Sequence, residues 1–347
     1  MNGYYYWGGK VDYESKLNSL GYEVYTVSVG PISSNWDRAI EAFYQIKGGQ
    51  VDYGNFKTQN YDIITKPDNK YYKGFYPKWN EKNPIHIIGH SQGGQTAKML
   101  EKLLKESFSD EDSPLLSNSF NQWIKSITTI STPHNGTTLV PIMMNAFPFA
   151  LHLAPWFGRI ENKSINNFFN FDLDHWGLER ASEESFNNYF SRLSASPLID
   201  DKALCSYDLS IEGAFDFNKN YTADSSVYYF SYSTFATKVK KDSIHHKPSS
   251  ELSFHLWPTS MLIGNDEEAP NSNWYENDGI CNTTSMTHPY NQNFNAYDGE
   301  PKKGIWQHID KLHIDHQGVI GHGILRKEHD NIFALYNKHC KLLYSLK

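Results

Sequence analysis

Cysteine is scarce in this sequence, with three residues among 347: Cys205, Cys281 and Cys340. An odd number without a C-x-x-C motif predicts neither a disulfide framework nor a thiolate metal site, and it leaves the cellular compartment open. Long runs of one charge are also missing, and 32 basic and 39 acidic residues give a net charge of −7. The sequence therefore carries no electrostatic sign of nucleic-acid binding.

A secretory signal peptide is not visible, because Met1 leads into a run of tyrosines and not into a basic segment followed by an apolar one. One apolar stretch, residues 137–158, is long enough for a membrane span. Its three prolines would break a spanning helix, so we predict no transmembrane segment. We interpret the stretch as an apolar lid over a binding site, and a pair of ordinary buried helices is the alternative.

Internal repeats and low-complexity linkers are absent too, so we predict one domain over 1–347 with a lid insertion at about 137–200. Apolar spacing predicts helices over 13–20, 37–46 and 330–345, and mainly helical structure over 160–222. Strands are predicted over 23–29, 85–88, 124–130 and 227–232, and mostly loops over 240–330. Because strands alternate with helices, we expect an α/β fold with a mostly parallel sheet and helices on both faces.

The centre of the sequence is the stretch IHIIGHSQGG at residues 85–94, where a strand pattern changes directly into a helical one. This is the G-x-S-x-G arrangement, in which flanking glycines let neighbouring backbone pass close to a strained turn. Such a turn lifts the hydroxyl of Ser91 above the edge of the sheet, where it can act as a nucleophile. The N–H of Gln92, at the start of the helix, would then stabilise an oxyanion.

A serine hydroxyl is a poor nucleophile at neutral pH, so it requires a base and an acid that orients the base. In α/β-hydrolases both follow the nucleophile, the acid before the histidine. Asp278 precedes a glycine in a predicted loop and is the candidate acid. Four histidines are candidate bases, and spacing alone does not decide among them: His313, His316, His322 and His329.

Several long motifs, in the same order along the chain as in a known family, indicate a resemblance to that family. They include YWGG at 6–9, SSNWDRA at 33–39, HSQGGQT at 90–96, TPHNGT at 132–137, LDHWGL at 173–178 and ENDG at 276–279. On these motifs the chain resembles the secreted bacterial triacylglycerol lipases of the staphylococcal and Geobacillus group over nearly its whole length. The resemblance implies an α/β-hydrolase fold with a helical lid. It also implies that Ser91 is the nucleophile, Asp278 the acid and His316 the base.

The function implied by this resemblance is hydrolysis of triacylglycerols or similar fatty-acyl esters, through a Ser-His-Asp acyl-enzyme mechanism at a lipid–water interface. The resemblance also implies secretion, although the printed start contains no signal peptide. A short-chain esterase or a phospholipase is an alternative within the enzymes. An inactive, lipid-binding protein of the same fold is a non-enzymatic alternative.

The non-enzymatic alternative follows from one departure from the family. Its members have a strand ending in His-Gly-Phe that supplies the second oxyanion donor, and this chain starts after that point. The first central strand is therefore expected to be missing, and with it half of the oxyanion hole. Loss of one such donor typically lowers the rate by about 10²–10³-fold.

Two further departures concern metal ions. The family binds zinc through two aspartates and two histidines; Asp37 and Asp174 match the aspartates, but residues 55–61, where histidines should stand, contain none. The family's calcium is held by acidic residues just after the base, and residues 317–323 contain no carboxylate. Because zinc prefers imidazole or thiolate and calcium needs several oxygens, we predict no metal or other cofactor. Asp37 and Asp174 would then serve local hydrogen bonding.

Overall fold

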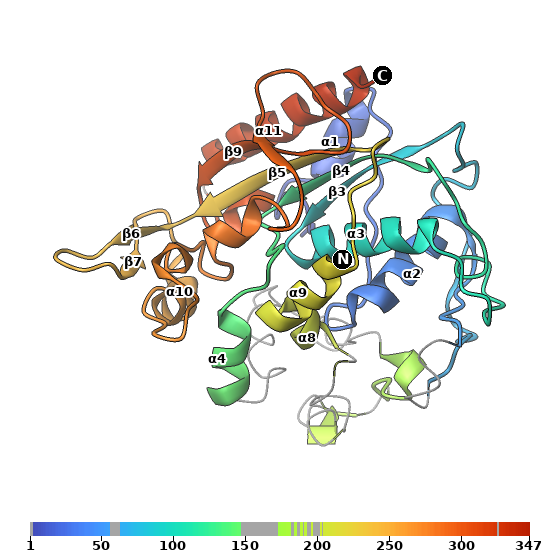
Figure 1. The fold of residues 1–347 in the computed structure, drawn as a ribbon, viewed down its shortest axis with the longest axis horizontal. Helices are drawn as coiled ribbons and strands as arrows, with labels where there is room; N and C mark the ends of the chain where they lie inside the picture. The colour runs from blue at the N-terminus through green and yellow to red at the C-terminus, as the bar shows by residue number, and fades with distance from the viewer. Residues whose placement is uncertain are drawn as a thin grey trace.

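Five parallel strands form the central sheet of this protein (Figure 1). The computed structural model describes residues 3–55, 63–146, 173–181, 204–324 and 326–347, with scattered residues between 184 and 202. The spatial order of the strands is β3-β4-β5-β9-β8. Their bounds are β3 Ile85–His90, β4 Ile124–Ile130, β5 Tyr228–Phe235, β8 Phe294–Ala296 and β9 Trp306–His313. The predicted α/β class with a mostly parallel sheet is confirmed.

Helices cover both faces of the sheet, as the sequence predicts (Figure 1). On one face α2 packs on α3, and α3 packs on β3 and β4, around a core that includes Ile127 and Trp306. On the other face the apolar sides of α1 and α11 contact Ile130 and Tyr232. The bounds are α1 Tyr13–Ser19, α2 Asn35–Lys47, α3 Gln92–Lys105 and α11 Arg326–Ser345.

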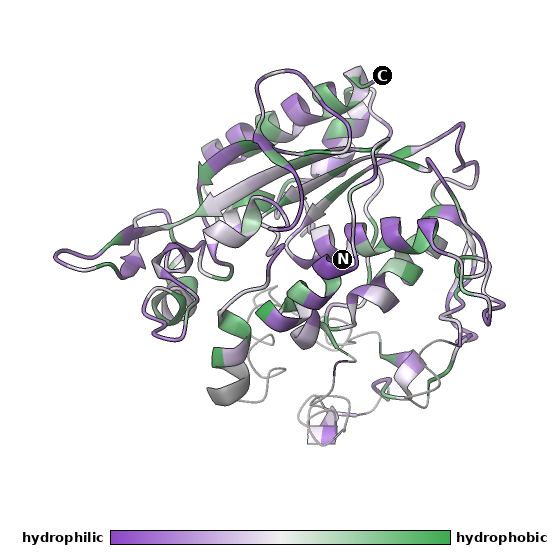
Figure 2. Ribbon diagram, in the orientation of Figure 1, coloured by the Kyte–Doolittle hydropathy of each residue, from purple (hydrophilic) through white to green (hydrophobic). Residues whose placement is uncertain are grey.

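The hydropathy of these helices follows the layers. In Figure 2, hydrophobic and hydrophilic residues alternate along α3 and α11, which is the pattern of a helix with one side on a core. In α3 the buried side includes Leu100, Leu103 and Leu104. The closing helix begins one turn before the predicted residue 330 and ends at the predicted place.

Smaller elements surround the sheet. Strand β1 pairs with β2, and β6 with β7, each pair antiparallel. The bounds of these strands and of the shorter helices are β1 Gly49–Gln50, β2 Tyr71–Tyr72, β6 Thr237–Val239, β7 His246–Pro248, α4 Leu139–Ala146, α8 Cys205–Leu209, α9 Ile211–Lys219 and α10 Trp257–Ile263. Single 3-10 turns are Asp174–Trp176, Phe254–Leu256, Ser272–Trp274, Thr283–Met286 and Gly318–Ile320.

The lid insertion expected at about 137–200 lies largely outside the described residues, and so does most of the helical structure expected over 160–222. Within these two ranges the described elements are α4, the 3-10 turn Asp174–Trp176, α8 and α9. The lid and the single-domain organisation therefore stay predictions. Among the described residues, no helix combines the length and the apolar character needed to cross a membrane.

The strand predicted over 23–29 is wrong, because no described strand pairs with this segment. Side chains bind its backbone instead: the amide of Asn18 bonds both the N–H and the carbonyl of Val24, and the amide of Gln45 does the same for Ser28. Strand β3 lies at one end of the sheet order, and no described strand pairs with its other edge. The valines of 23–29 do pack against a core, although they are only partly buried, but an apolar pattern cannot supply a pairing partner.

The loops expected over 240–330 include β9, a strand of the central sheet that the sequence analysis misses. Its sequence is WQHIDKLH, and five of its eight residues are polar or charged. Strand β9 pairs with β5 along its length, whereas the short β8 pairs only with Trp306, Gln307 and His308. The second half of β9 thus has an open edge with exposed side chains, and such a strand shows no clear apolar pattern.

Glycines around the serine turn allow α3 to lie directly on β3. A Cβ atom at Gly89 would lie 2.5 Å from the backbone carbonyl carbon of Gly93, and one at Gly94 would lie 2.1 Å from Oγ1 of Thr132. A Cβ atom at Gly93 would meet no atom within 4 Å. The close approach of α3 to β3 therefore requires Gly89, and its close approach to β4 and the loop after it requires Gly94.

We expect Gly89→Ala to lower the free energy of unfolding by about 2 kcal/mol or more, because backbone atoms cannot move aside as a side chain can. Gly93→Ala is the matched control. It should be neutral or stabilising by up to ~1 kcal/mol, because alanine favours the helix. Urea unfolding of both variants measures the difference, and equal stability of Gly89→Ala and wild type would contradict this packing.

Candidate active site

Ser91 lies at the turn between β3 and α3 with φ 54° and ψ −130°. A positive φ costs a residue with a side chain about 1–3 kcal/mol, so the surroundings must hold it. Here the N–H of Ser91 donates to the carbonyl of Ile130 on β4 at 2.9 Å, and the hydroxyl of Thr132 donates to the carbonyl of Ser91 at 2.9 Å. Strand β4 and its following loop thus hold the strained turn in place.

Gln92, the predicted oxyanion donor, is the first residue of α3. Its backbone N–H has no acceptor among the described residues, and it belongs to the helix end where the dipole favours negative charge. The side-chain amide of Gln92 donates to the Ser33 carbonyl at 3.2 Å and to Oδ1 of Asn35 at 3.1 Å, which orients the residue. An N–H is therefore available beside Ser91 for a developing oxyanion.

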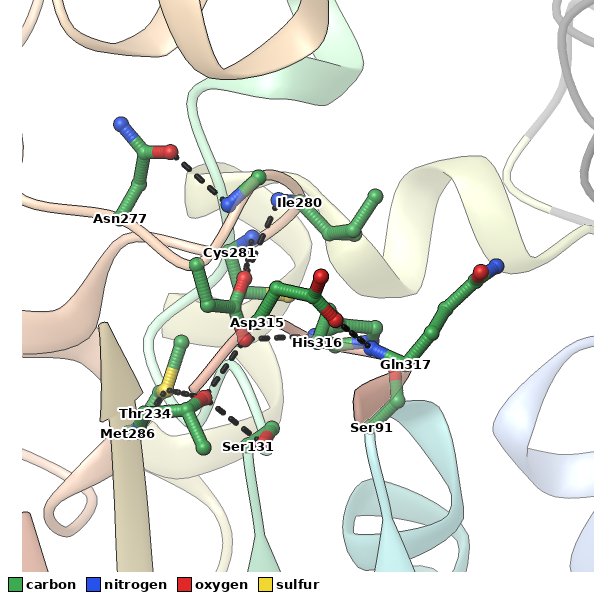
Figure 3. Close-up of polar contacts among 12 residues, drawn as sticks. Ser91, Ser131, Thr234, Asn277, Ile280, Cys281, Met286, Asp315, His316 and Gln317 are labelled. Atoms are coloured by element: carbon green, nitrogen blue, oxygen red, sulfur yellow. Dashed lines mark hydrogen bonds and ion pairs between the residues drawn. The ribbon is translucent and has the colours of Figure 1, made fainter. Parts of the chain in front are cut away.

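His316 is the histidine that the structure brings to Ser91 (Figure 3). Its Nε2 lies 2.9 Å from Oγ of Ser91, and its Nδ1 lies 2.7 Å from Oδ2 of Asp278. Because an ionised carboxylate only accepts, we assign the ring proton to Nδ1, which leaves Nε2 free to accept from the serine hydroxyl. The arrangement has the geometry of a nucleophile, a base and an orienting acid.

The carboxylate of Asp278 is fully buried and receives four hydrogen bonds. Oδ1 accepts from the backbone N–H groups of Ile280, at 3.1 Å, and Cys281, at 2.9 Å. Oδ2 accepts from the Thr234 hydroxyl at 2.6 Å and from His316. These donors compensate for the loss of water around the charge, and they fix both oxygens relative to the imidazole.

The sequence analysis assigns no role to three residues that support the site, namely Thr234, His90 and Tyr6. Thr234, near the end of β5, binds the acid and also bonds Ser131 at 2.8 Å (Figure 3). His90 donates from Nε2 to the carbonyl of His316 at 2.9 Å, and the Tyr6 hydroxyl binds Nδ1 of His90 at 2.8 Å. Burial, with a smaller contribution from the nearby His316, holds the pKa of His90 well below its usual range. His90 therefore stays neutral and adds no positive charge beside the base.

The other candidate histidines point elsewhere. His313 stacks on Phe235 with ring centroids 4.4 Å apart, and His322 donates from Nε2 to backbone carbonyls near the N-terminus. His329 bonds the hydroxyl of Tyr13 at 3.1 Å. Geometry thus selects the residue that spacing alone left undecided.

Comparison with known proteins places this geometry in a family. The family model "Lipase-like, C-terminal domain" matches residues 2–341. The chain belongs to this family. It is 35% identical to Lipase 1 of Staphylococcus aureus (strain MRSA252) over 332 residues, and 34% identical to a lipase of Staphylococcus epidermidis over 331 residues. These matches cover 91% of the chain and 47% of each relative, so the chain spans about half the length of the curated relatives it matches.

Solved structures agree with this family membership. The structure of EstA from Clostridium botulinum is similar with a TM-score of 0.85 and 36% identity, over 96% of this chain and 83% of that one. The crystal structure of Staphylococcus hyicus lipase gives a TM-score of 0.85 and 31% identity, over 99% and 90% of the two chains. The predicted resemblance and the α/β-hydrolase fold are confirmed.

In this lipase-family chain the two aspartates matched to the zinc ligands lie beside basic side chains. The ammonium of Lys70 lies 2.9 Å from Oδ1 of Asp174 and 2.7 Å from Oε1 of Glu41, and it also donates to the Tyr53 hydroxyl at 3.0 Å. Burial would lower the pKa of Lys70, but the two carboxylates outweigh burial and raise it. The charged ammonium of Lys70 therefore offsets part of the negative charge of this buried acidic cluster.

A histidine also lies beside the aspartates: His175, the residue that follows Asp174. Its Nε2 lies 3.5 Å from Oδ2 of Asp37 and its Nδ1 lies 3.9 Å from Oδ1 of Asp174, while its ring stacks on Tyr53. Burial lowers the pKa of His175, but its interactions with Asp174 and Asp37 outweigh burial and raise it. For Asp174 burial is likewise outweighed, by His175 and Lys70, and its pKa falls to about 2.

This donor set does not fit zinc. The Nε2 atom of His175 faces Asp37, and its Nδ1 atom faces Asp174. No single nitrogen of this ring therefore lies beside both carboxylates, as it would have to if all three residues bound one ion. A tetrahedral zinc site needs four ligands at about 2.0–2.3 Å, and an ammonium cannot be one of them. Asp174 forms an ion pair with Lys70, whereas Asp37 accepts a hydrogen bond from the Ser34 hydroxyl at 3.0 Å, which is local hydrogen bonding of the kind expected from the sequence.

The residues after the base do not fit calcium either. The nearest carboxylate, that of Asp315, accepts from the backbone N–H groups of Gln317 at 3.0 Å, Gly318 at 2.7 Å and Ser253 at 2.8 Å. Residues 317–323 add no carboxylate. A hard cation requires six to eight oxygens, several of them charged, and this segment offers one carboxylate already bound by its own backbone.

We expect Lys70→Met to lower the free energy of unfolding by about 3–5 kcal/mol, because it removes the ammonium that pairs with the buried carboxylates of Glu41 and Asp174. Lys66→Met is the matched control. Lys66 pairs with Asp52 at 3.1 Å but its side chain is 57% exposed, so its loss should cost ~1 kcal/mol or less. Urea unfolding tests both, and similar losses in the two variants would show that the buried ammonium has no special role.

Proposed function

We propose that this chain is a serine ester hydrolase whose substrates are triacylglycerols or similar fatty-acyl esters. One observation carries the proposal: the continuous hydrogen-bonded series from Asp278 through His316 to Oγ of Ser91. Membership of the lipase-like family supports the substrate class. The names of the similar proteins, lipases and an esterase, point to the same chemistry.

In the proposed reaction Ser91 attacks the ester carbonyl while His316 takes the hydroxyl proton at Nε2. Asp278 keeps the imidazole in the tautomer with a proton on Nδ1 and stabilises the imidazolium that forms. The N–H of Gln92 binds the oxyanion of the tetrahedral intermediate. The imidazolium then gives its proton to the leaving alcohol, which leaves an acyl group on Ser91.

Deacylation repeats these steps with water. His316 takes a proton from the water molecule as it attacks the acyl carbonyl, and the proton returns to Oγ of Ser91 as the fatty acid leaves. Two properties of the site suit both halves of this cycle. The acid cannot turn, because four donors hold it, and the neighbouring His90 carries no charge that would oppose formation of the imidazolium.

We expect Ser91→Ala and His316→Ala to lower the turnover of p-nitrophenyl esters by about 10⁴-fold or more, because each removes a partner that acts in every step. His313→Ala is the matched control, since this histidine contacts Phe235 and Ser249 and not Ser91. The turnover rate of the His313→Ala variant should stay within about twofold of wild type. Circular dichroism confirms that each variant is folded. Undiminished turnover in folded Ser91→Ala would contradict the assignment.

The substrate class is tested with a series of triacylglycerols of increasing acyl length, measured below and above their solubility limits. A lipase should gain rate when the substrate forms an interface and should accept long acyl chains. Activity confined to short, dissolved esters would instead identify an esterase. Faster hydrolysis of phosphatidylcholine vesicles than of emulsified triacylglycerol would identify a phospholipase.

A further inference from the structure

A cysteine lies directly beside the acid and the base. Cys281 is 2% exposed, and one ligand atom from each of Asp278, Cys281 and His316 lies within 4.8 Å of the others. The backbone N–H of Cys281 binds the acid, but no hydrogen-bond partner for its thiol occurs among the described residues. Figure 3 shows the residue in the loop that carries the acid. A soft ligand with no hydrogen-bond partner in the described part of the chain therefore lies within 4.8 Å of a carboxylate and an imidazole.

We propose that Asp278, Cys281 and His316 form a binding site for a divalent cation of the zinc class, and that its occupation switches the base off. Thiolate, imidazole and carboxylate are the three ligand types that zinc and cadmium bind, and harder cations such as magnesium do not favour the thiolate. The inhibition rests on the proposed function, whereas the binding itself does not.

The geometry requires only a small adjustment. Zinc holds nitrogen and oxygen at about 2.0–2.2 Å and sulfur at about 2.3 Å, which places tetrahedral ligands roughly 3.3–3.7 Å apart. The carboxylate and the imidazole are already closer than this, at 2.7 Å, and the thiol lies within 4.8 Å of both. Movements of roughly 1 Å in the loop that bears the acid and the thiol would complete three ligand bonds, and water supplies the fourth.

Metal binding at Nδ1 changes the tautomer of the base. The metal replaces the proton that His316 shares with Asp278, so a neutral imidazole must carry its proton on Nε2. That nitrogen can then no longer accept the proton of Ser91, which is the reason that a wrong tautomer disables serine hydrolases. The proton balance is simple: the thiol of Cys281 loses one proton to solvent, and the ring proton moves from Nδ1 to Nε2.

The two other cysteines provide a comparison within the same chain. Cys205 and Cys340 are also buried and free, but neither belongs to a group of three metal-ligating side chains among the described residues. Burial alone therefore does not make such a site, and the proposal applies to Cys281 only.

The test is a titration of the purified chain, freed of metal with a chelator and desalted, with cadmium chloride. We expect an ultraviolet cadmium–thiolate charge-transfer band that saturates at one cadmium per chain in wild type and in Cys340→Ala. The band should be absent in Cys281→Ala and Cys281→Ser, the second of which preserves the size of the side chain. This readout requires no ester turnover, so it remains valid if the proposed function fails.

The functional consequence is measured with zinc chloride and a soluble p-nitrophenyl ester, each variant being compared with its own rate without metal. Saturating zinc should lower the wild-type rate by about 10²-fold or more. The inhibition constant should rise by about tenfold or more in Cys281→Ala, because a ligand is lost, and stay unchanged in Cys340→Ala. A missing cadmium band in wild type, or equal zinc inhibition of wild type and Cys281→Ala, would overturn the proposal.

Discussion

The hydrogen bond between Asp278 and His316 is the contact on which the site depends. Without it the imidazole could rotate or change tautomer, and Ser91 would lose its acceptor. The contact joins two loops that are far apart in sequence, and a backbone bond from the His316 N–H to the Asp278 carbonyl strengthens it. Both loops leave the same edge of the sheet, because all five strands are parallel and their carboxyl ends lie together. The sheet thus assembles the site.

Two buried acidic sites of this protein each have nearby groups that compensate the negative charge. Asp278 has four hydrogen-bond donors, and the cluster of Glu41, Asp37 and Asp174 has the ammonium of Lys70 and the imidazole of His175 beside it. In both places local groups are joined by partners from distant parts of the chain, Thr234 and His316 at Asp278 and Lys70 at Asp174, so these contacts form only when the chain folds. Where the family resemblance leads to zinc, this chain has an ammonium, which supplies positive charge without a metal and cannot be removed by a chelator.

The sequence predicts those features that are local. The elbow at Ser91 is recognisable because a strand pattern, two flanking glycines and a helical pattern occur within one short stretch, and its strained φ confirms the turn. The sequence analysis misses features that depend on strand pairing or on contacts between distant residues. Strand β9 carries polar residues because one of its edges stays open, and 23–29 has the pattern of a strand but pairs with none. Thr234 and His90 are ordinary residues in the sequence, and only their contacts give them a role.

The sequence by itself therefore determined the α/β class and, through long motifs, the family, and it located the serine turn that makes Ser91 the candidate nucleophile. These depend on patterns within a few residues of each other or on matches along the whole chain. The tertiary structure decided which histidine meets the serine, what holds the acid, and what balances Asp37 and Asp174. The four histidines are chemically equivalent, and the groups around the acid and the aspartates are common polar side chains. Their roles depend on which of them lie close together in the folded chain, and spacing along the sequence does not contain that information.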